Sequence, residues 1–178
     1  MEDRARAACS DLVPTPHNLD AYCDRASGRT LPVTSIDGDS TGASLPRVSI
    51  ALATYNGEPF LMEQLESLAQ QTLLPAELVV SDDGSTDKTI EIVREFAAHA
   101  PFDVVVLEHG ARLNYRLNFR RAAKHCSGDL IAFCDQDDVW VPNKLERMVR
   151  VFSDSKVQLA YHNAVVAGPE GTRLLHLA

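Results

Sequence analysis

Short apolar runs alternate with amphipathic stretches from residue 46 to residue 152 of this 178-residue chain. Four runs have the length and composition of buried strands: 48–53, 77–81, 102–107 and 130–134. Apolar residues recur at helical spacing in the segments after them: 59–72, 88–100, 118–126 and 142–152. Because consecutive parallel strands need a crossover that a helix normally supplies, the alternation predicts an α/β fold with a mostly parallel, doubly wound sheet and helices on both faces.

Polar side chains follow three of these runs at the point where each strand is expected to end: Thr54-Tyr55-Asn56, Asp82-Asp83 and Asp135-Gln136-Asp137-Asp138. In open α/β sheets, ligands bind at the carboxyl ends of the strands. Two carboxylates about 4 Å apart repel by about 4 kcal/mol at an effective dielectric of about 20, so the cluster after residue 134 needs water, a proton or a cation to offset the repulsion. Carboxylates hold hard cations, so Mg²⁺ or Mn²⁺ is the expected cofactor.

Each acidic segment also has a simpler interpretation. Residues 82–87 have the composition of a turn followed by a helix cap, and residues 135–138 could form a solvated acidic loop. The second segment is also similar to the nucleophile loop of haloacid-dehalogenase-type phosphatases, in which Asp135 would attack and Asp137 would act as acid and base. That alternative leaves Thr54 to Gly57 and the Asp82-Asp83 pair without a role.

Composition excludes several other classes. The formal net charge of -8 argues against nucleic acid as a partner, because backbone phosphates need a basic face. The sequence has neither a Gly-x-Gly-x-x-Gly nor a Gly-x-x-x-x-Gly-Lys-Ser/Thr loop, and the four cysteines lack zinc-ligand spacing and form no disulfide framework. It has no apolar segment of the roughly 18 to 20 residues that span a bilayer and no secretory signal at its start. A cytoplasmic location is therefore expected.

The ends of the chain differ from its centre. Residues 1–45 show neither periodicity and are expected to form a poorly ordered leader, so the folded domain is expected to cover 46–178. Residues 157–166 are expected to form a further strand. After Gly168-Pro169-Glu170-Gly171 too few residues remain for a second lobe.

Four segments together carry a resemblance to a known family. They are Val-Ser-Ile-Ala-Leu-Ala-Thr-Tyr-Asn-Gly at 48–57, Leu-Glu-Ser-Leu-Ala-Gln-Gln-Thr at 65–72, Val-Val-Ser-Asp-Asp-Gly-Ser-Thr-Asp at 79–87 and Phe-Cys-Asp-Gln-Asp-Asp-Val-Trp-Val-Pro-Asn-Lys-Leu at 133–145. In this order the chain resembles the family 2 glycosyltransferases, in their rhamnosyltransferase-like branch. Ordered motifs over such a length are far more specific than a lone Asp-x-Asp.

The resemblance implies a Rossmann-like GT-A fold that binds a nucleotide-diphospho-sugar donor and transfers the sugar, with inversion, to a glycan or lipid-linked acceptor. It places Ala53 and Thr54 near the base, with Asp83, beside Asp82, accepting a hydrogen bond from the base. Asp135 would lie near the ribose, and the metal ligands would be Asp137 and Asp138. The metal would act as a Lewis acid on the leaving diphosphate. Peripheral association with the inner face of a membrane is compatible with such an acceptor.

This sequence departs from the family pattern at three points. Asn114 stands where a glycine is usual, although asparagine tolerates a positive φ better than most residues. Tyr161-His162-Asn163 stands where Tyr-Ser-Asp is common. Family members place the general base and the acceptor surface beyond the position of Ala178, so we name no catalytic base here. We therefore expect a truncated donor-binding part, and nucleotide and metal binding without turnover is the alternative function.

Overall fold

The computed structural model describes residues 45–108, 112–168 and 171–175. The predicted leader therefore lies outside the described residues, except for Leu45. By their internal contacts the described residues belong to two units, one that ends at Gln158 and one that begins at Leu159. Each unit is described by itself.

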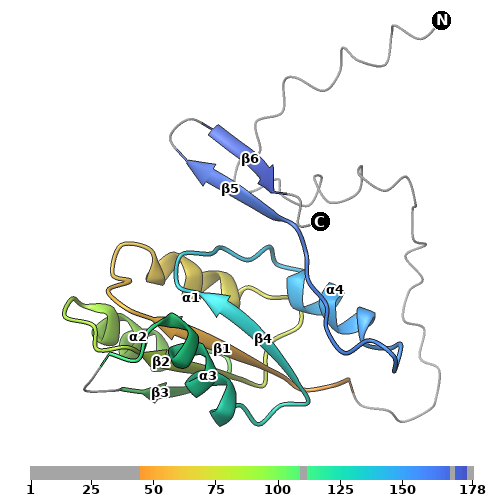
Figure 1. The fold of residues 1–178 in the computed structure, drawn as a ribbon, viewed down its shortest axis with the longest axis horizontal. Coiled ribbons are helices and arrows are strands. Elements are labelled where there is room, and N and C mark those ends of the chain that lie inside the picture. The colour runs from red at the N-terminus through yellow and green to blue at the C-terminus, as the bar shows by residue number, and fades with distance from the viewer. Residues whose placement is uncertain (1–44, 109–111, 169–170, 176–178) are drawn as a thin grey trace, which may run out of the picture. The chain divides into compact units, whose positions relative to one another are not determined.

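The first unit alternates strand and helix as predicted (Figure 1). Its elements are β1 (Val48–Thr54), α1 (Leu61–Ala69), β2 (Glu77–Asp82), α2 (Thr89–Ala97), β3 (Asp103–Leu107), α3 (Tyr115–His125), β4 (Leu130–Asp135) and α4 (Lys144–Val151). All strand pairs in this sheet are parallel, and the order across it is β3-β2-β1-β4. The expected α/β architecture is confirmed.

Helices cover both faces of the sheet. Apolar side chains of α1, α2 and α4, among them Leu65, Val93 and Leu145, share one core with residues of β1 and β2. On the other face, Ala122 of α3 packs against Ala51 and Val79. The central strand β1 is buried along its whole length, which explains its continuous run of small and branched apolar residues.

Two helix starts differ from the positions that periodicity predicts. α3 begins at Tyr115 rather than residue 118, because the side chain of Asn114 accepts hydrogen bonds from the N–H groups of Arg116 and Leu117 and so caps the helix. Asn114 has φ 78°, a conformation that asparagine tolerates better than most residues. α1 begins at Leu61 rather than at Pro59, because Gly57 O accepts the main-chain N–H groups of residues 60 and 61 and closes a turn first.

The second unit corrects the prediction of a strand over 157–166. Residues 159–163 have no regular structure, and β5 (Ala164–Gly168) instead pairs antiparallel with β6 (Gly171–Leu175). Residues 171–175 thus form the second strand of an antiparallel pair. Polar residues at 161–163 interrupt the apolar run, which is why strand pairing begins only after them.

Candidate nucleotide-binding site

The strand order brings together the polar strand ends that the sequence predicts. The chain runs from β1 outward through β2 to β3 and then crosses back to place β4 on the other side of β1. In the strand register, Thr54 lies opposite Asp82 and Ala53 lies opposite Asp135. The carboxyl end of β1 is thus the topological switch point, where doubly wound sheets bind ligands.

A cleft of about 320 Å³ opens at this point. Its lining is Ala53, Thr54, Tyr55, Asp83, Arg112, Asn114, Tyr115, Asn118, Phe119, Asp135 and Gln136. Four of the predicted nucleotide-binding residues, Ala53, Thr54, Asp83 and Asp135, therefore share one wall. Asp82, Asp137 and Asp138 do not line it.

Asp82 is buried and its carboxylate is fully engaged inside the protein. One oxygen accepts hydrogen bonds from the hydroxyl groups of Thr54, at 2.9 Å, and Ser85, and the other accepts the N–H groups of Gly84, at 3.0 Å, and Ser85, at 2.8 Å. These contacts close the turn after β2, where Gly84 takes a positive φ of 81°. The structure therefore gives Asp82 the turn function that its sequence context also allowed.

Asp83 is equally buried but reaches the cleft. Its two carboxylate oxygens accept the main-chain N–H groups of Leu113 and Asn114, and its own N–H donates to Thr54 O at 2.9 Å. The residue thus fastens the start of α3 over the end of β1. Each carboxylate oxygen keeps a second lone pair, so Asp83 can also accept a donor from a ligand.

The acidic segment after β4 differs from the buried pair Asp82 and Asp83, because its carboxylates face solvent. Asp137 and Asp138 are exposed. Partial burial raises the pKa of Asp135 above its ordinary value. A hydrogen bond from the main-chain N–H of Gln136 lowers this pKa, and the negative charges of Asp137 and Asp138 raise it. The carboxylates therefore repel one another, and a cation would relieve that repulsion.

These carboxylates fit a cation that is shared with a substrate. In the described part of the chain, no three His, Cys, Asp or Glu side chains gather closely enough to hold a metal by themselves. Magnesium, however, is commonly held by one or two carboxylates together with substrate phosphates. Asp135 at the cleft wall and the exposed carboxylates beyond it provide that kind of donor set.

Side chains from α1 and from the residues just after it fix the loop that follows the acidic segment. Gln71 is buried, and its amide nitrogen donates to Val141 O at 2.8 Å while its amide oxygen accepts Leu145 N–H at 3.1 Å. Ser67 Oγ accepts the N–H of Trp140 at 3.1 Å. These contacts explain why polar residues face the core on an otherwise apolar helix face.

The loop end also carries a buried cation. Lys144 Nζ lies 3.7 Å from the ring centroid of Trp140, and burial lowers the pKa of Lys144 to about 8. Nearby Cys134 is buried as the sequence suggested, and burial raises the pKa of its thiol to about 12. That thiol is an inert part of the core.

Two cleft residues, Arg112 and Asn118, were not predicted to belong to the site, whereas Tyr55 was expected at this strand end. The guanidinium of Arg112 stacks on the ring of Tyr55 at 3.9 Å, and both side chains line the cleft. Asn118 is buried and donates from Nδ2 to Thr54 O at 3.1 Å, whereas its Oδ1 has no hydrogen-bond partner among the described residues. No local pattern marks these residues, because they are joined only when the segment before α3 folds over β1.

Arg121 lies in the predicted helix 118–126, where a charged side chain is expected to face solvent. In the structure it instead donates to the main-chain oxygens of Leu107 and Glu108, at 2.9 Å each, and so links α3 to the end of β3. Arg120, by contrast, is exposed.

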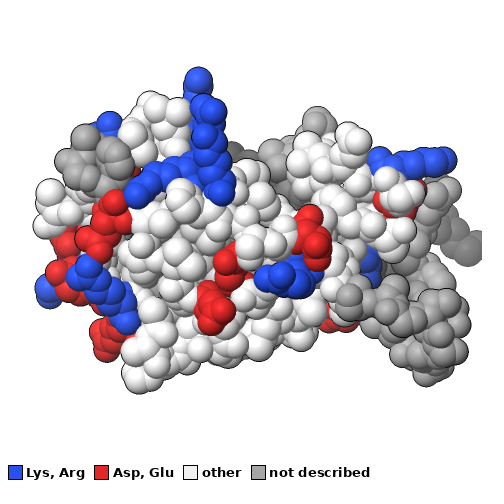
Figure 2. All heavy atoms as spheres, turned by 90° about the horizontal axis from the view of Figure 1, so that it is seen from below, with Lys and Arg blue, Asp and Glu red and all other residues white. Residues whose placement is uncertain are grey.

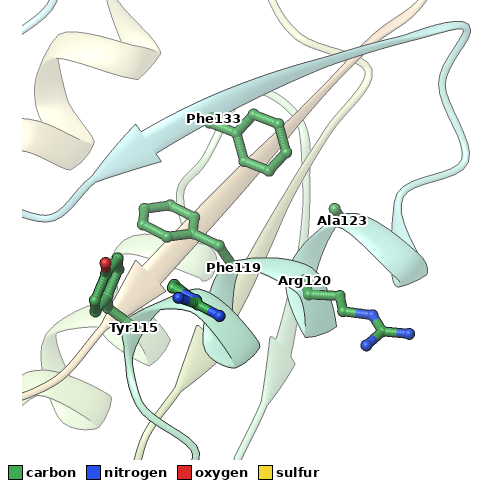
Figure 3. A pocket seen from close by; sticks show the side chains of 6 residues that line it. Tyr115, Phe119, Arg120, Ala123 and Phe133 are labelled. Atoms are coloured by element: carbon green, nitrogen blue, oxygen red, sulfur yellow. The ribbon is translucent and has the colours of Figure 1, made fainter.

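A second, apolar hollow of about 480 Å³ lies between α3 and β4 (Figure 3). Phe119 and Phe133 meet edge to face across it, with centroids 5.9 Å apart, and Tyr115 stands at one end. Phe133 is 60% exposed, which is unusual for a phenylalanine in a strand. Tyr115 and Phe119 line both this hollow and the cleft at the switch point.

On the face shown in Figure 2, basic side chains occur in small groups between acidic and uncharged ones. Extended basic stripes, which characterise surfaces that bind nucleic-acid backbones, are not seen on that face. None of the helices in the described ranges is both long and apolar enough to cross a bilayer.

The fold and the cleft define an α/β domain of the GT-A type. The structure of mannosyltransferase PcManGT from Pyrobaculum calidifontis in complex with GDP-Man and Mn²⁺ superposes with a TM-score of 0.60 at 29% identity, over 64% of this chain and 34% of that one. Residues 49–177 match the sequence profile of the family described as Glycosyl transferase family 2. The chain belongs to that family.

Two curated relatives illustrate the range of enzymes that the chain resembles. The dTDP-rhamnosyl transferase RfbG of Shigella flexneri is 31% identical over 70% of this chain and 44% of its own length. The Escherichia coli enzyme WfgD, named UDP-Glc:alpha-D-GlcNAc-diphosphoundecaprenol beta-1,3-glucosyltransferase, is 34% identical over 65% of this chain and 45% of its own. This chain spans less than half the length of either relative.

Proposed function

We propose that the unit formed by β1 to α4 is the donor-binding part of a glycosyltransferase that moves a sugar from a nucleoside diphosphate to an acceptor hydroxyl. One observation carries the proposal: a carboxylate, Asp135, and a cation–π pair, Tyr55 and Arg112, line the same cleft at the switch point. Such a cleft suits a nucleotide, whose base stacks and whose diphosphate needs a cation.

In this proposal, different residues of the cleft contact different parts of the nucleotide. Thr54 O already accepts two hydrogen bonds, so the base would meet Asp83 and the cation–π pair rather than this carbonyl. Asp135 would accept a ribose hydroxyl, while Asp137 and Asp138 would hold Mg²⁺ or Mn²⁺. When bound, the cation would neutralise charge on the leaving diphosphate.

The finer assignments are also proposals. Similarity to the dTDP-rhamnosyl transferase supports placement in the rhamnosyltransferase-like branch, and the name of the Escherichia coli relative supports a lipid-linked glycan as acceptor. We place the protein in the cytoplasm or on the inner face of the membrane, where such donors and acceptors meet. Inversion at the anomeric carbon is proposed from family membership. The haloacid-dehalogenase alternative is not retained, because the chain belongs to a different family.

Isothermal titration calorimetry of the full chain with UDP, dTDP and GDP, each with and without Mn²⁺, tests the proposal. We expect at least one nucleotide to bind more tightly with Mn²⁺, and Asp137→Ala to remove that dependence. Asp103→Ala, which removes an exposed carboxylate at the opposite end of the sheet, is the matched control and should bind as the wild type does. Failure of all three nucleotides to bind would refute the proposal. Preference for dTDP would support the rhamnosyltransferase-like branch.

Nucleotide binding without turnover is distinguished by a second measurement. Release of nucleoside diphosphate from the matching nucleotide sugar, followed with the full chain and Mn²⁺, reports turnover by transfer to water or to an added acceptor. Binding together with release supports a complete enzyme, whereas binding without release supports a donor-binding domain.

A further inference from the structure

Gln136 stands between the carboxylates Asp135 and Asp137, and its side chain is bound to a different part of the cleft. The N–H of Tyr55 donates to Gln136 Oε1 at 2.8 Å, and Gln136 Nε2 donates to Tyr55 O at 3.1 Å. Because a main-chain N–H can only donate and a carbonyl can only accept, both ends of the amide are used and its orientation is fixed. The side chain thereby extends the pairing of β1 with β4 beyond their last register pair, Ala53 and Asp135.

Gly57 gives this side chain the space that it occupies. A Cβ atom built on Gly57 would lie 2.6 Å from Gln136 Oε1 and 2.9 Å from Gln136 Cδ, closer than real Cβ atoms come to other groups. Gly57 is not among the residues with a positive φ, so its backbone conformation does not require glycine. Glycine is therefore needed here for the close approach of Gln136.

The two segments that Gln136 joins both line the cleft. Tyr55 carries the ring on which Arg112 stacks. Asp135 lines the cleft on the β4 side and leads into the exposed carboxylates. The main chain beyond those carboxylates is held separately, through Ser67 of α1 and Gln71 just after it. The acidic segment is thus fixed on both sides while its carboxylates stay free.

We infer that Gln136 is a positioning residue, which holds Tyr55 and the Arg112 stacked on it beside the acidic segment so that one nucleotide reaches both. Gly57 serves the same role from the other side, by leaving room for the amide. The inference rests on the proposed function of the cleft. Outer-shell groups of this kind, when removed, typically lower metal affinity by about 10- to 100-fold.

Two independent variants test the inference. Gln136→Met keeps the length of the side chain and loses both hydrogen bonds, and Gly57→Ala displaces the amide without changing Gln136. With the nucleotide that the wild type binds best, we expect each variant to lose about tenfold or more in affinity with Mn²⁺ present and less than about twofold in EDTA. The double variant should be no weaker than the weaker single variant, because both changes break the same contact.

Gly128→Ala is the matched control. A Cβ there would lie 2.7 Å from Arg47 O and from Ser49 Oγ, a clash that involves the main chain and lies at the amino end of the sheet. It should lower stability and leave the dependence on Mn²⁺ unchanged.

The inference is overturned if Gln136→Met keeps the Mn²⁺ dependence of the wild type, if it weakens binding equally with and without metal, or if Gly128→Ala has the same effect. A wild-type chain that binds no nucleotide would instead refute the proposed function itself. Because Gln136→Met adds no bulk, it decides the question even if Gly57→Ala does not fold.

Discussion

Asp82 at the end of β2 and Asp137 after β4 have similar surroundings in the sequence: a mostly apolar strand precedes each, and another aspartate follows each directly. In the structure they differ completely. Asp82 is buried and accepts four hydrogen bonds from Thr54, Gly84 and Ser85, whereas Asp137 is exposed. A carboxylate whose lone pairs are used by the protein is part of the architecture, and one left free is available for a ligand.

The largest expected effect comes from removing the carboxylate of Asp82, the buried residue of this pair. Asp82→Ala should lower the free energy of unfolding by about 3 kcal/mol, because four donors, of which the Thr54 hydroxyl is buried and the others are partly buried, lose an acceptor. Urea denaturation measures this value. Asp82→Asn retains one acceptor oxygen and should cost about half as much; equal losses for both variants would show that the charge, rather than the number of hydrogen bonds, stabilises the turn.

Asp137→Ala should show the reverse pattern. Its free energy of unfolding should change by no more than about 0.5 kcal/mol, since an exposed side chain is removed. Affinity for the preferred nucleotide with Mn²⁺ should fall by at least about tenfold, equivalent to about 1.4 kcal/mol. A large loss of stability in metal-free Asp137→Ala would contradict the conclusion that Asp82 is structural whereas Asp137 is available for a ligand.

A third variant tests whether Gln71, just after α1, rather than the carboxylates holds the loop that follows the acidic segment in place. Gln71→Ala should lower the free energy of unfolding by about 2 kcal/mol, because Leu145 N–H and Val141 O lose their partner. Thermal unfolding and urea titration both measure this change in the free energy of unfolding. The neighbouring Gln70 is exposed, so Gln70→Ala provides the matched control and should change stability by less than about 0.5 kcal/mol.

The smallest effect concerns charge repulsion within the free cluster. The folded protein raises the pKa of Asp135 above 3.8, so this residue binds a proton more tightly when folded, and its contribution to stability is lost as pH rises through the folded pKa. Asp135→Asn should therefore stabilise the metal-free protein at pH 7 by up to about 0.5 kcal/mol, with the gain vanishing below the unfolded pKa. Unfolding measured from pH 3 to pH 7 checks the sign. A gain that persists at pH 3 would exclude ionisation as its cause.

The fold was predictable because its signals are local. The apolar run of Val48 to Ala53 and the spacing of Leu61, Leu65 and Leu68 each lie within a few residues. The start of α3 was placed too late, since its cap at Asn114 depends on a positive φ that periodicity does not reveal. The hairpin of β5 and β6 was missed because strand pairing, rather than apolar content, decides where a strand begins.

The site was only partly predictable. Thr54, Asp83 and Asp135 could be named because they follow strands, and strand ends share one edge of a parallel sheet. Their convergence required the strand order, which spacing alone does not give. The contacts of Arg112 with Tyr55 and of Gln136 with Tyr55 join segments far apart in the chain, so no local pattern encodes them.

Among the described strands, β4 pairs only with β1, and it presents Ile131 and Phe133 to solvent at 43% and 60% exposure. A strand with a free row of N–H and C=O groups beside large apolar side chains adds readily to another strand. In purified solutions this chain should therefore self-associate as its concentration rises, even though its net charge of -8 favours colloidal stability. Phe133→Lys should keep it monomeric in sedimentation experiments.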